Sequence, residues 1–373
     1  MRRSFDEVFE DVTKHGTKVK TDEYYANGAH IIIDQGQEQI AGYTDLEDGL
    51  FTSVPALVFG DHTRVVKYVD QPFFLGADGV KVLRSKFSDA NYRYLYYALK
   101  SIRIPNTGYN RHFKWLKQAK IEYPDKEEQR SIVTLLDKVS NIIEVRKAQL
   151  QKFDHLVKAR FVEMFGDPVE NPKGYRVDTL QALIDAGDIT YHLDGNHGGD
   201  YPKSEEFVSE GVPYIGANCI SNGEIDFSLA KYLTVERAGK LRKGIAQNED
   251  VLFAHNATVG PTVVLHTTEP KVILSTSLTA YRCNKESIMP EYLATYMKSD
   301  GFVMQYSGEM KQTTRNQVPI TAQKKYLFLI PPMEEQKAFS EFVKQVDKSK
   351  VVVQKALNGA QLLFDSLMQQ YFG

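Results

Sequence analysis

The chain has 373 residues, with 42% hydrophobic residues, 25% charged residues and a formal net charge of −2. These values predict a folded protein of two or more domains, and they give no bulk-charge support for a nucleic-acid partner, so any basic surface must be local. The absence of a long apolar stretch and of a secretory signal, with only two cysteines, excludes a membrane span and favours the reducing cytoplasm.

The first 123 residues mix strand and helix signals and form the first predicted domain. Apolar runs at residues 30–34, 55–60 and 79–84 predict strands, and residues 91–101 predict a short helix. Glycine turns separate these runs, so we expect the α+β class for this domain.

Residues 124–166 predict one long helix. Asp125 is a candidate N-cap, and Glu128 three residues later completes a capping box. Apolar residues then recur with a heptad period over five heptads, which is typical of a coiled coil. The two columns are Ile132, Val139, Arg146, Phe153, Arg160 and Leu136, Ile143, Leu150, Val157, Met164.

A Gly- and Pro-containing linker at 166–175 leads into the second predicted domain, residues 167–330. Strands are expected at residues 250–254, 261–266 and 326–330, and a short helix at 290–299. Residues 331–373 predict a second long helix. Its heptad columns are Phe339, Val346, Val353, Ala360, Leu367 and Val343, Lys350, Leu357, Phe364, Tyr371.

The second half of the chain repeats the first. Glu127-Glu128-Gln129 returns as Glu334-Glu335-Gln336, and residues 94–101 and 5–12 return at 292–299 and 177–184. We therefore expect two variable domains of mixed α/β type, joined by two long helices that form an antiparallel coiled coil about a pseudo-two-fold axis. The alternative is two amphipathic helices, each packed on its own domain.

Catalytic motifs are scarce. The sequence contains no GxxxxGK[ST], GxGxxG or GxSxG pattern, so we assign no catalytic residue. His192, Asp194 and His197 lie close together in the sequence and could bind a metal, but no third His or Cys stands at a standard spacing, so we assign no metal site. The alternative is a polar, glycine-rich loop at 195–200, with no clear strand before it, that presents Asn196 and His197 to a partner.

Two polar stretches, residues 106–114 and 311–317, precede the last strand of each domain. Arginine can read guanine, asparagine and glutamine can read adenine, and lysine and threonine suit phosphates. An ordinary solvent-exposed loop is the alternative. The DNA-binding candidates in these stretches are Asn110, Arg111, Lys114, Lys311, Gln312, Thr314, Arg315 and Gln317.

Two variable domains alternating with two long helices, opened by "YPDKEEQ" and "IPPMEEQ", resemble the DNA-specificity subunit of type I restriction–modification systems. The resemblance covers essentially the whole chain. Further matching stretches are "DGNHG", "GVPYIGANCISNGEIDF" and "DVLFAHNATVG". The first helix departs from the pattern with Asp125 where Pro332 stands in the second, but aspartate also caps helices well.

The resemblance implies a non-catalytic subunit, cytoplasmic and without cofactors of its own, whose domains each read half of a bipartite double-stranded DNA site. The helices would set the spacing and dock two methyltransferase subunits, joined by ATP-dependent restriction subunits; S-adenosylmethionine and ATP are expected on those partners. We expect the helix-opening residues Glu127, Glu128, Gln129, Glu334, Glu335 and Gln336 to contact them. A stand-alone enzyme acting on nucleic acid and a protein-binding coiled-coil scaffold remain the alternatives.

Overall fold

The computed structural model describes residues 1–108, 110–310 and 316–373. They divide into two compact units: unit 1 is Met1–Ala148 with Gln354–Gly373, and unit 2 is Gln149–Val353. The long helices α4 (Lys126–Phe165) and α10 (Met333–Phe372) each contribute to both units, so the compact units cut across the division at 123, 166 and 330 made from the sequence. Of the helices described, none is both long and apolar enough to cross a membrane.

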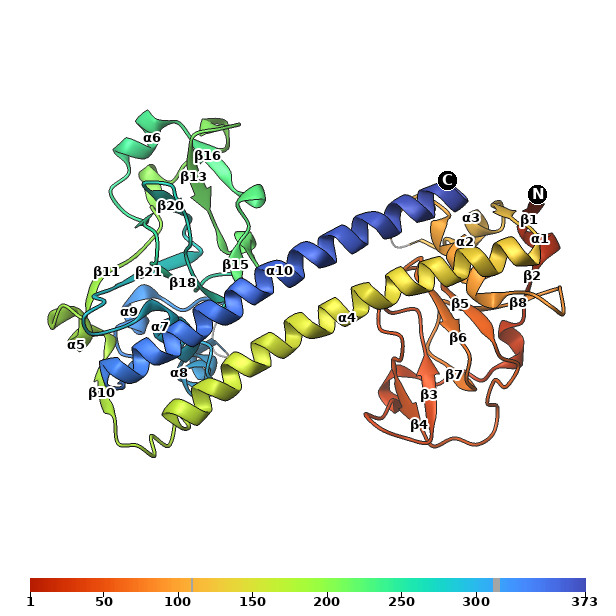
Figure 1. Ribbon diagram of the computed structural model, residues 1–373, viewed down its shortest axis with the longest axis horizontal. Helices are drawn as coiled ribbons and strands as arrows, with labels where there is room; N and C mark the ends of the chain where they lie inside the picture. Colours follow the sequence, from red (N-terminus) through yellow and green to blue (C-terminus); the bar gives the residue numbers. More distant parts are fainter. Residues whose placement is uncertain (109, 311–315) are drawn as a thin grey trace. The chain divides into compact units, whose positions relative to one another are not determined.

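Unit 1 is built on a four-stranded antiparallel sheet and a three-stranded sheet (Figure 1). The larger sheet has the order β2 (Phe9–Asp11), β8 (Val80–Ser85), β5 (Ala56–Gly60), β6 (Val66–Val69), and the smaller has β4 (Gly42–Thr44), β3 (His30–Ile33), β7 (Phe73–Leu75). A third pair joins β1 (Arg2–Ser4) to β9 (Lys120–Glu122). The α-helices are α1 (Phe5–Val8), α2 (Tyr92–Ser101) and α3 (Phe113–Leu116), and 3-10 turns span Thr13–His15 and Thr21–Glu23.

Unit 2 repeats this plan with additions. Its four-stranded sheet has the order β11 (Ile189–Asp194), β21 (Leu278–Cys283), β18 (Val251–Ala254), β19 (Thr262–Val264). The second sheet has β12 (Phe207–Val208), β16 (Lys231–Leu233), β13 (Val212–Ile215), β20 (Val272–Leu274), β17 (Ile245–Ala246); β10 (Arg176–Thr179) pairs with β22 (Leu327–Ile330), and β14 (Ile220–Ser221) with β15 (Glu224–Ile225). The α-helices are α5 (Leu180–Asp185), α6 (Val235–Lys240), α7 (Pro290–Tyr296), α8 (Asp300–Met310) and α9 (Ile320–Gln323), with 3-10 turns at Gly198–Asp200, Ser204–Glu206, Ala217–Cys219 and Phe227–Leu229.

The repeat seen in the sequence extends to strand pairing. The order β2-β8-β5-β6 corresponds strand by strand to β11-β21-β18-β19. The second sheet of each unit contains one parallel pair among antiparallel ones: β3 with β7 in unit 1, and β13 with β20 in unit 2. The expected α+β class with an internal repeat is therefore confirmed.

Each long helix begins with the same hydrogen bond. The Gln129 amide donates to the backbone oxygen of Pro124 (2.9 Å), and the Gln336 amide donates to that of Pro331 (2.8 Å). Both glutamines are buried, which explains why glutamine recurs at the end of the tripeptide. Asp125 accepts from the backbone N–H of Glu128 (2.9 Å), as expected of an N-cap.

The helices pack antiparallel in each unit. In unit 1, Leu136 and Ile143 near the start of α4 share a buried cluster with Phe364 and Leu367 near the end of α10. In unit 2, Phe161 near the end of α4 packs edge-on against Phe339 near the start of α10, with ring centroids 5.6 Å apart. The predicted pairing of the two helices is therefore confirmed.

One part of the predicted heptad pattern is wrong. The columns place Arg160 in the α4 seam, whereas the structure buries Phe161 and leaves the Arg160 guanidinium 5.9 Å from the Phe342 ring centroid. A straight helix drifts about 20° per heptad from a strict seven-residue repeat, and four heptads move the buried face by nearly one residue. Lys350, the charged residue in the columns of α10, pairs with Asp154 of α4 (2.6 Å).

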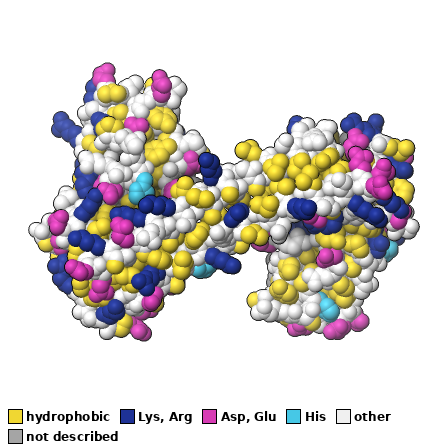
Figure 2. All heavy atoms as spheres, viewed as in Figure 1, with side chains coloured by type: hydrophobic (Ala, Val, Ile, Leu, Met, Phe, Trp, Pro, Cys, Tyr) yellow, Lys and Arg dark blue, Asp and Glu magenta, His cyan; other side chains and the backbone are white. Residues whose placement is uncertain are grey.

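Both helices also carry exposed apolar side chains. Figure 2 shows hydrophobic side chains along the long helices, and the strongly exposed ones include Ile142 and Val145 in unit 1 and Val351 and Val352 in unit 2. Exposed apolar residues grouped on one element mark protein-binding surfaces more often than scattered ones do.

Two neighbouring leucines of α4 test the packing of unit 1. Leu136 is fully buried, whereas Leu135 is 36% exposed. We expect Leu136→Ala to lower the free energy of unfolding by about 2–5 kcal/mol, because it removes buried methyl groups and leaves a cavity. Leu135→Ala should cost about 1 kcal/mol or less. Urea denaturation followed by circular dichroism measures both; equal losses would contradict the assigned helix face.

Candidate nucleic-acid interface

The first polar stretch is fixed to the hairpin turn that follows β5. The backbone N–H of His112 donates to the Asp61 carbonyl (2.8 Å), and the N–H of Phe113 donates to the Asp61 carboxylate (2.7 Å). Asp61 and His112 are both buried. The C-terminal end of this stretch is therefore held in place by hydrogen bonds to Asp61.

The predicted side chains of this stretch face solvent. Asn110, Arg111 and Lys114 are exposed, although the Asn110 amide also donates to the backbone oxygen of Thr107. The hydrogen bond from Lys18 (2.8 Å) holds the pKa of Asp78 below its usual range, and the charges of Arg111 and His62 act in the same direction. Arg111 thus lies close to the turn that contains Asp78.

The second polar stretch is attached to the equivalent hairpin turn in unit 2, the turn that follows β18. The backbone N–H of Val318 donates to the His255 carbonyl (2.8 Å), and that of Ala257 donates to the Asn316 carbonyl (3.0 Å). His255 follows β18 as Asp61 follows β5. Gln317 is exposed, and its backbone forms an isolated antiparallel β-bridge with Asn256. The candidates Lys311, Gln312, Thr314 and Arg315 lie outside the described residues.

A buried hydrogen-bond network supports this second stretch. Gln323 of α9 accepts from His192 (3.1 Å) and from the Tyr281 hydroxyl (2.5 Å), and its amide nitrogen donates to Thr279 (3.2 Å) and to the Val318 carbonyl (3.2 Å). Thr279 is also 2.6 Å from Nδ1 of His255. An amide oxygen only accepts, so Nε2 of His192 carries a proton.

Both histidines of this network are held neutral. Burial lowers the pKa of His192 to about 4, and the Gln323 hydrogen bond acts in the opposite direction. Burial likewise lowers the pKa of His255 to about 4. A charged imidazole at either position would lose its hydration without gaining a carboxylate partner.

The loop after β11 differs from its prediction. Gly195 follows β11 directly, so the expectation of no strand before this loop is wrong. Asn196 is buried; its amide donates to the Lys243 carbonyl (2.7 Å) and its oxygen accepts from the Lys243 N–H (3.3 Å). This buried side chain therefore stabilises the loop instead of facing solvent. His197 is exposed and lies 2.7 Å from the Asp194 carboxylate.

The metal alternative finds no support in this loop. His192 points to Gln323, away from the pair formed by Asp194 and His197. Within residues 1–108, 110–310 and 316–373, no group of three His, Cys, Asp or Glu side chains is placed to hold a metal ion.

The helix-opening residues have separate positions. Glu127, Glu128 and Glu334 are exposed, whereas Gln129 and Gln336 are buried and used at the helix starts. The Glu335 carboxylate accepts from the Tyr175 hydroxyl (2.7 Å), which ties the linker to α10 within unit 2. Of the six residues, only the three exposed glutamates keep carboxylates free for a partner protein.

Two further loops join these surfaces, and their residues were not among the DNA-binding candidates selected from the sequence. Gln35 in unit 1 accepts from the backbone N–H of His62 (3.1 Å), and Ser277 in unit 2 accepts from that of Ala217 (2.8 Å). The loops directly follow β3 and β13. The loop after β13 lies in a stretch that carried part of the family resemblance, and the loop after β3 was not singled out. In both loops an apolar strand gives way to Gly, Asn or Gln.

The fold and these surfaces define a class: a duplicated α+β protein in which paired long helices support two domains, each with a polar segment on an equivalent hairpin turn. The family model described as type I restriction modification DNA specificity domain matches residues 2–153 and 187–359, and the chain belongs to this family. Its two matched segments correspond to the two halves of the repeat.

Curated relatives and solved structures agree with this assignment. The type I restriction enzyme MjaVIII specificity subunit of Methanocaldococcus jannaschii is 22% identical over 63% of the chain, and the alignment spans 56% of that protein. The putative MjaX specificity subunit of the same organism is 23% identical over 85% of the chain and 75% of its own length. The crystal structure of a type I restriction-modification S subunit from M. genitalium shares the fold, with a TM-score of 0.62 at 18% identity over 100% of this chain and 96% of that one.

The neutral histidines generate a pH prediction. The pKa values of both histidines in the folded chain lie below the unfolded value near 6.5. Their contribution to the free energy of unfolding is therefore complete above about pH 6.5 and is lost as the pH falls toward 4. Each corresponds to on the order of 3 kcal/mol. Unit 2 should therefore unfold at lower temperature at pH 5 than at pH 7.5.

His192→Gln keeps a donor for Gln323 but does not titrate, so about half of this pH-dependent loss should disappear. His155→Gln, on the exposed face of α4, is the matched control and should leave the pH dependence unchanged. Thermal denaturation across this pH range measures both, and parallel curves for His192→Gln and the unsubstituted chain would refute the assignment.

Proposed function

We propose that this chain reads a bipartite, asymmetric double-stranded DNA target and directs partner methyltransferase and restriction subunits to it. The observation that carries the proposal is the equivalent seating of the two polar segments. In unit 1 the segment ends on the carbonyl of Asp61, and in unit 2 it ends on the carbonyl of His255, the first residue after corresponding strands. Two similar seats with different exposed side chains suit the reading of two different half-sites.

The exposed side chains have the chemistry for this task. Arg111 suits guanine, Asn110 and Gln317 suit adenine, and Lys114 suits a phosphate. The net charge of −2 makes a continuous basic groove implausible for this chain alone. Contacts to many phosphates would then come from the partner subunits.

Partner docking is assigned to the long helices. Exposed apolar residues on both helices, with the exposed carboxylates of Glu127, Glu128 and Glu334 at their starts, support two docking sites of similar design. Because the chain contains a repeat, two copies of one methyltransferase subunit would bind by related contacts. ATP-dependent restriction subunits would join this complex, with S-adenosylmethionine and ATP bound by the partners.

The chain itself is proposed to be non-catalytic. Purified chain incubated with labelled S-adenosylmethionine and DNA should transfer no label, because the sequence has no recognisable cofactor-binding loop. The complex with its methyltransferase subunits should label a discrete set of sites. Mapping methylated positions in the source genome with and without the gene for this chain gives the target. Label transfer by rigorously purified chain would support a stand-alone enzyme, and labelling by the complex without sequence preference would favour a scaffold.

Helix length is proposed to set the spacing between half-sites. One heptad inserted after Val139 and one after Val346 keep the apolar seam in phase and add about 10 Å at ~1.5 Å per residue. At ~3.4 Å per base pair, the preferred spacer should lengthen by about three base pairs. These pairs also rotate one half-site by roughly a quarter-turn, so affinity should fall even at the best spacing.

The measurement is methylation of a DNA library that carries the two half-sites at every spacing, by the complex with inserted heptads. A single heptad inserted in α4 alone is the matched control. It makes α4 longer than α10, so the two helices no longer match in length and assembly should be impaired. A soluble, fully assembled double variant that still prefers the original spacing would show that the helices do not set it.

A further inference from the structure

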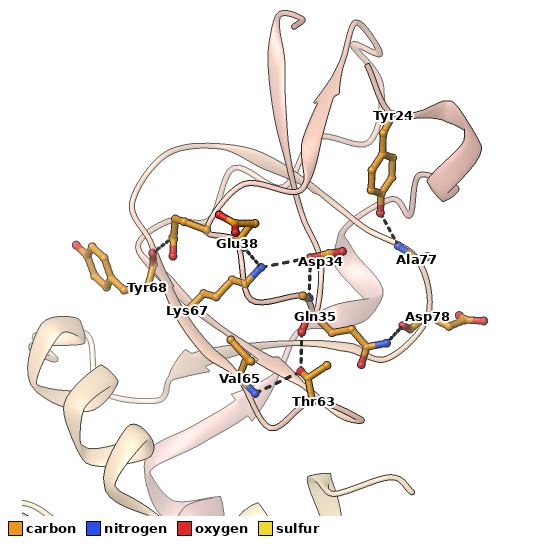
Figure 3. A network of polar contacts seen from close by, with 12 residues as sticks. Tyr24, Asp34, Gln35, Glu38, Thr63, Val65, Lys67, Tyr68, Ala77 and Asp78 are labelled. Atoms are coloured by element: carbon orange, nitrogen blue, oxygen red, sulfur yellow. Dashed lines mark hydrogen bonds and ion pairs between the residues drawn. The ribbon is translucent and has the colours of Figure 1, made fainter. Parts of the chain in front are cut away.

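A buried lysine supports the loop that follows β3 in unit 1 (Figure 3). The Lys67 side chain is only 3% exposed; its Nζ lies 3.3 Å from the Asp34 carboxylate and donates to the backbone oxygen of Glu38. Burial lowers the pKa of Lys67, while Asp34 acts against this change. A buried cation is costly unless its neighbours satisfy it, and here the neighbours are the two ends of one exposed loop.

The same loop is fixed from its other side. The Gln35 amide donates to the Asp78 carbonyl (3.0 Å), and its backbone oxygen accepts from the Thr63 hydroxyl (2.5 Å), as Figure 3 shows. Thr63 belongs to the hairpin turn that seats the first polar stretch, and Asp78 lies near Arg111. The loop is therefore part of the surface already proposed to face DNA.

These contacts leave one amide unused at the tip. Asp34, Gln35 and Gln39 all have internal hydrogen bonds, the last to the Tyr68 carbonyl (2.8 Å). Gln37 is exposed, and its side chain has no hydrogen-bond partner among the residues that the structure describes. Its neighbour Glu38 uses its backbone oxygen for Lys67 and keeps its carboxylate exposed.

Unit 2 places a second amide at the corresponding point. In the parallel pairs, Ile33 stands opposite Leu75 and Ile215 stands opposite Leu274. Gln37 follows Ile33 by four residues, and the exposed Asn218 follows Ile215 by three.

Asn218 also lies beside the seat of its own polar stretch. The neighbouring Ala217 N–H donates to the Ser277 hydroxyl (2.8 Å), and Ser277 accepts at its backbone oxygen from the N–H of His255 (3.0 Å). Gly216 leaves room for the side chain, because a Cβ there would lie 2.8 Å from Oδ1 of Asn218. The loops therefore have the same place in both units, although different side chains support them.

We propose that Gln37 and Asn218 are base-reading residues, one for each half-site, and that Lys67 is the positioning residue for Gln37; the inference rests on the proposed function. A carboxamide offers a donor and an acceptor together, the pattern that matches N7 and the N6 amino group of adenine in the major groove. The Glu38 carboxylate would repel a phosphate but accept from an exocyclic amino group. The tip of the unit 1 loop thus suits a base edge better than the DNA backbone.

The experiment uses the assembled methyltransferase complex on a DNA library randomised at every position of the mapped target. Gln37→Ala should reduce discrimination at one position of one half-site by roughly 5- to 150-fold, the usual value of a bidentate contact. Asn218→Ala should do the same in the other half-site. Both side chains are exposed, so folding and assembly should be unaffected.

Exposed asparagines elsewhere are the matched controls. The first control is Asn27→Ala; Asn27 lies before β3, at the opposite end of the strand from Gln37. The second is Asn222→Gly; Asn222 lies in the turn between β14 and β15, where its φ is +51°. Both should keep the full target preference. Lys67→Met should relax the same base as Gln37→Ala and leave the other half-site unchanged, whereas a purely structural role would lower assembly or melting temperature without changing the preferred base.

The outcomes separate this inference from the proposed function. An assembled Gln37→Ala or Asn218→Ala complex that retains full discrimination at all positions overturns the base-reading role and leaves the proposed function standing. Relaxation in both half-sites by either variant also overturns it. If the unsubstituted complex methylates without sequence preference, the proposed function itself is wrong, and the inference falls with it.

Discussion

The structure depends on burying the apolar faces of two 40-residue helices against each other and against the sheets. In unit 1, Tyr97 of α2 packs near Phe364 of α10, with ring centroids 6.1 Å apart, although 267 residues separate them in the chain. Phe372, next to the last residue, packs near Tyr94 at 5.4 Å. The core of unit 1 is therefore incomplete until the end of the chain is in place, which makes folding strongly non-local.

This packing fixes the backbone that carries the two exposed polar segments. Loops tolerate change in sequence when the elements that carry them are packed independently of the loop tips. The carbonyls of Asp61 and His255 receive the two polar segments directly after buried strands, so the exposed residues are positioned by the sheet. A binding site with a fixed backbone pays less conformational entropy on association, and its specificity is set by side chains alone.

The two units keep the same backbone plan but use different chemistry beneath it. Unit 1 supports the loop after its central strand with the buried ion pair of Lys67 and Asp34, whereas unit 2 uses the hydroxyl of Ser277. Under its second polar segment, unit 2 adds neutral histidines joined through Gln323. Hydrogen-bonded polar groups in a protein interior can fix one conformation without dominating stability. Divergence of such supports after duplication would allow each unit to hold its own set of exposed side chains.

The sequence by itself determined the repeat, the two long helices, their apolar faces and several strands, because these depend on local periodicity and on capping residues such as Asp125. Tertiary structure decided which side chains remain available. Asn196 is buried against Lys243, and Gln129 and Gln336 form hydrogen bonds at the helix starts. Phe161, and not Arg160, lies in the buried face of α4. Tertiary structure also left the side chains of Gln37 and Asn218 exposed beside the two polar segments. The physical reason is that hydrogen bonds and packing between residues far apart in the chain decide burial, and a local pattern contains no information about those partners.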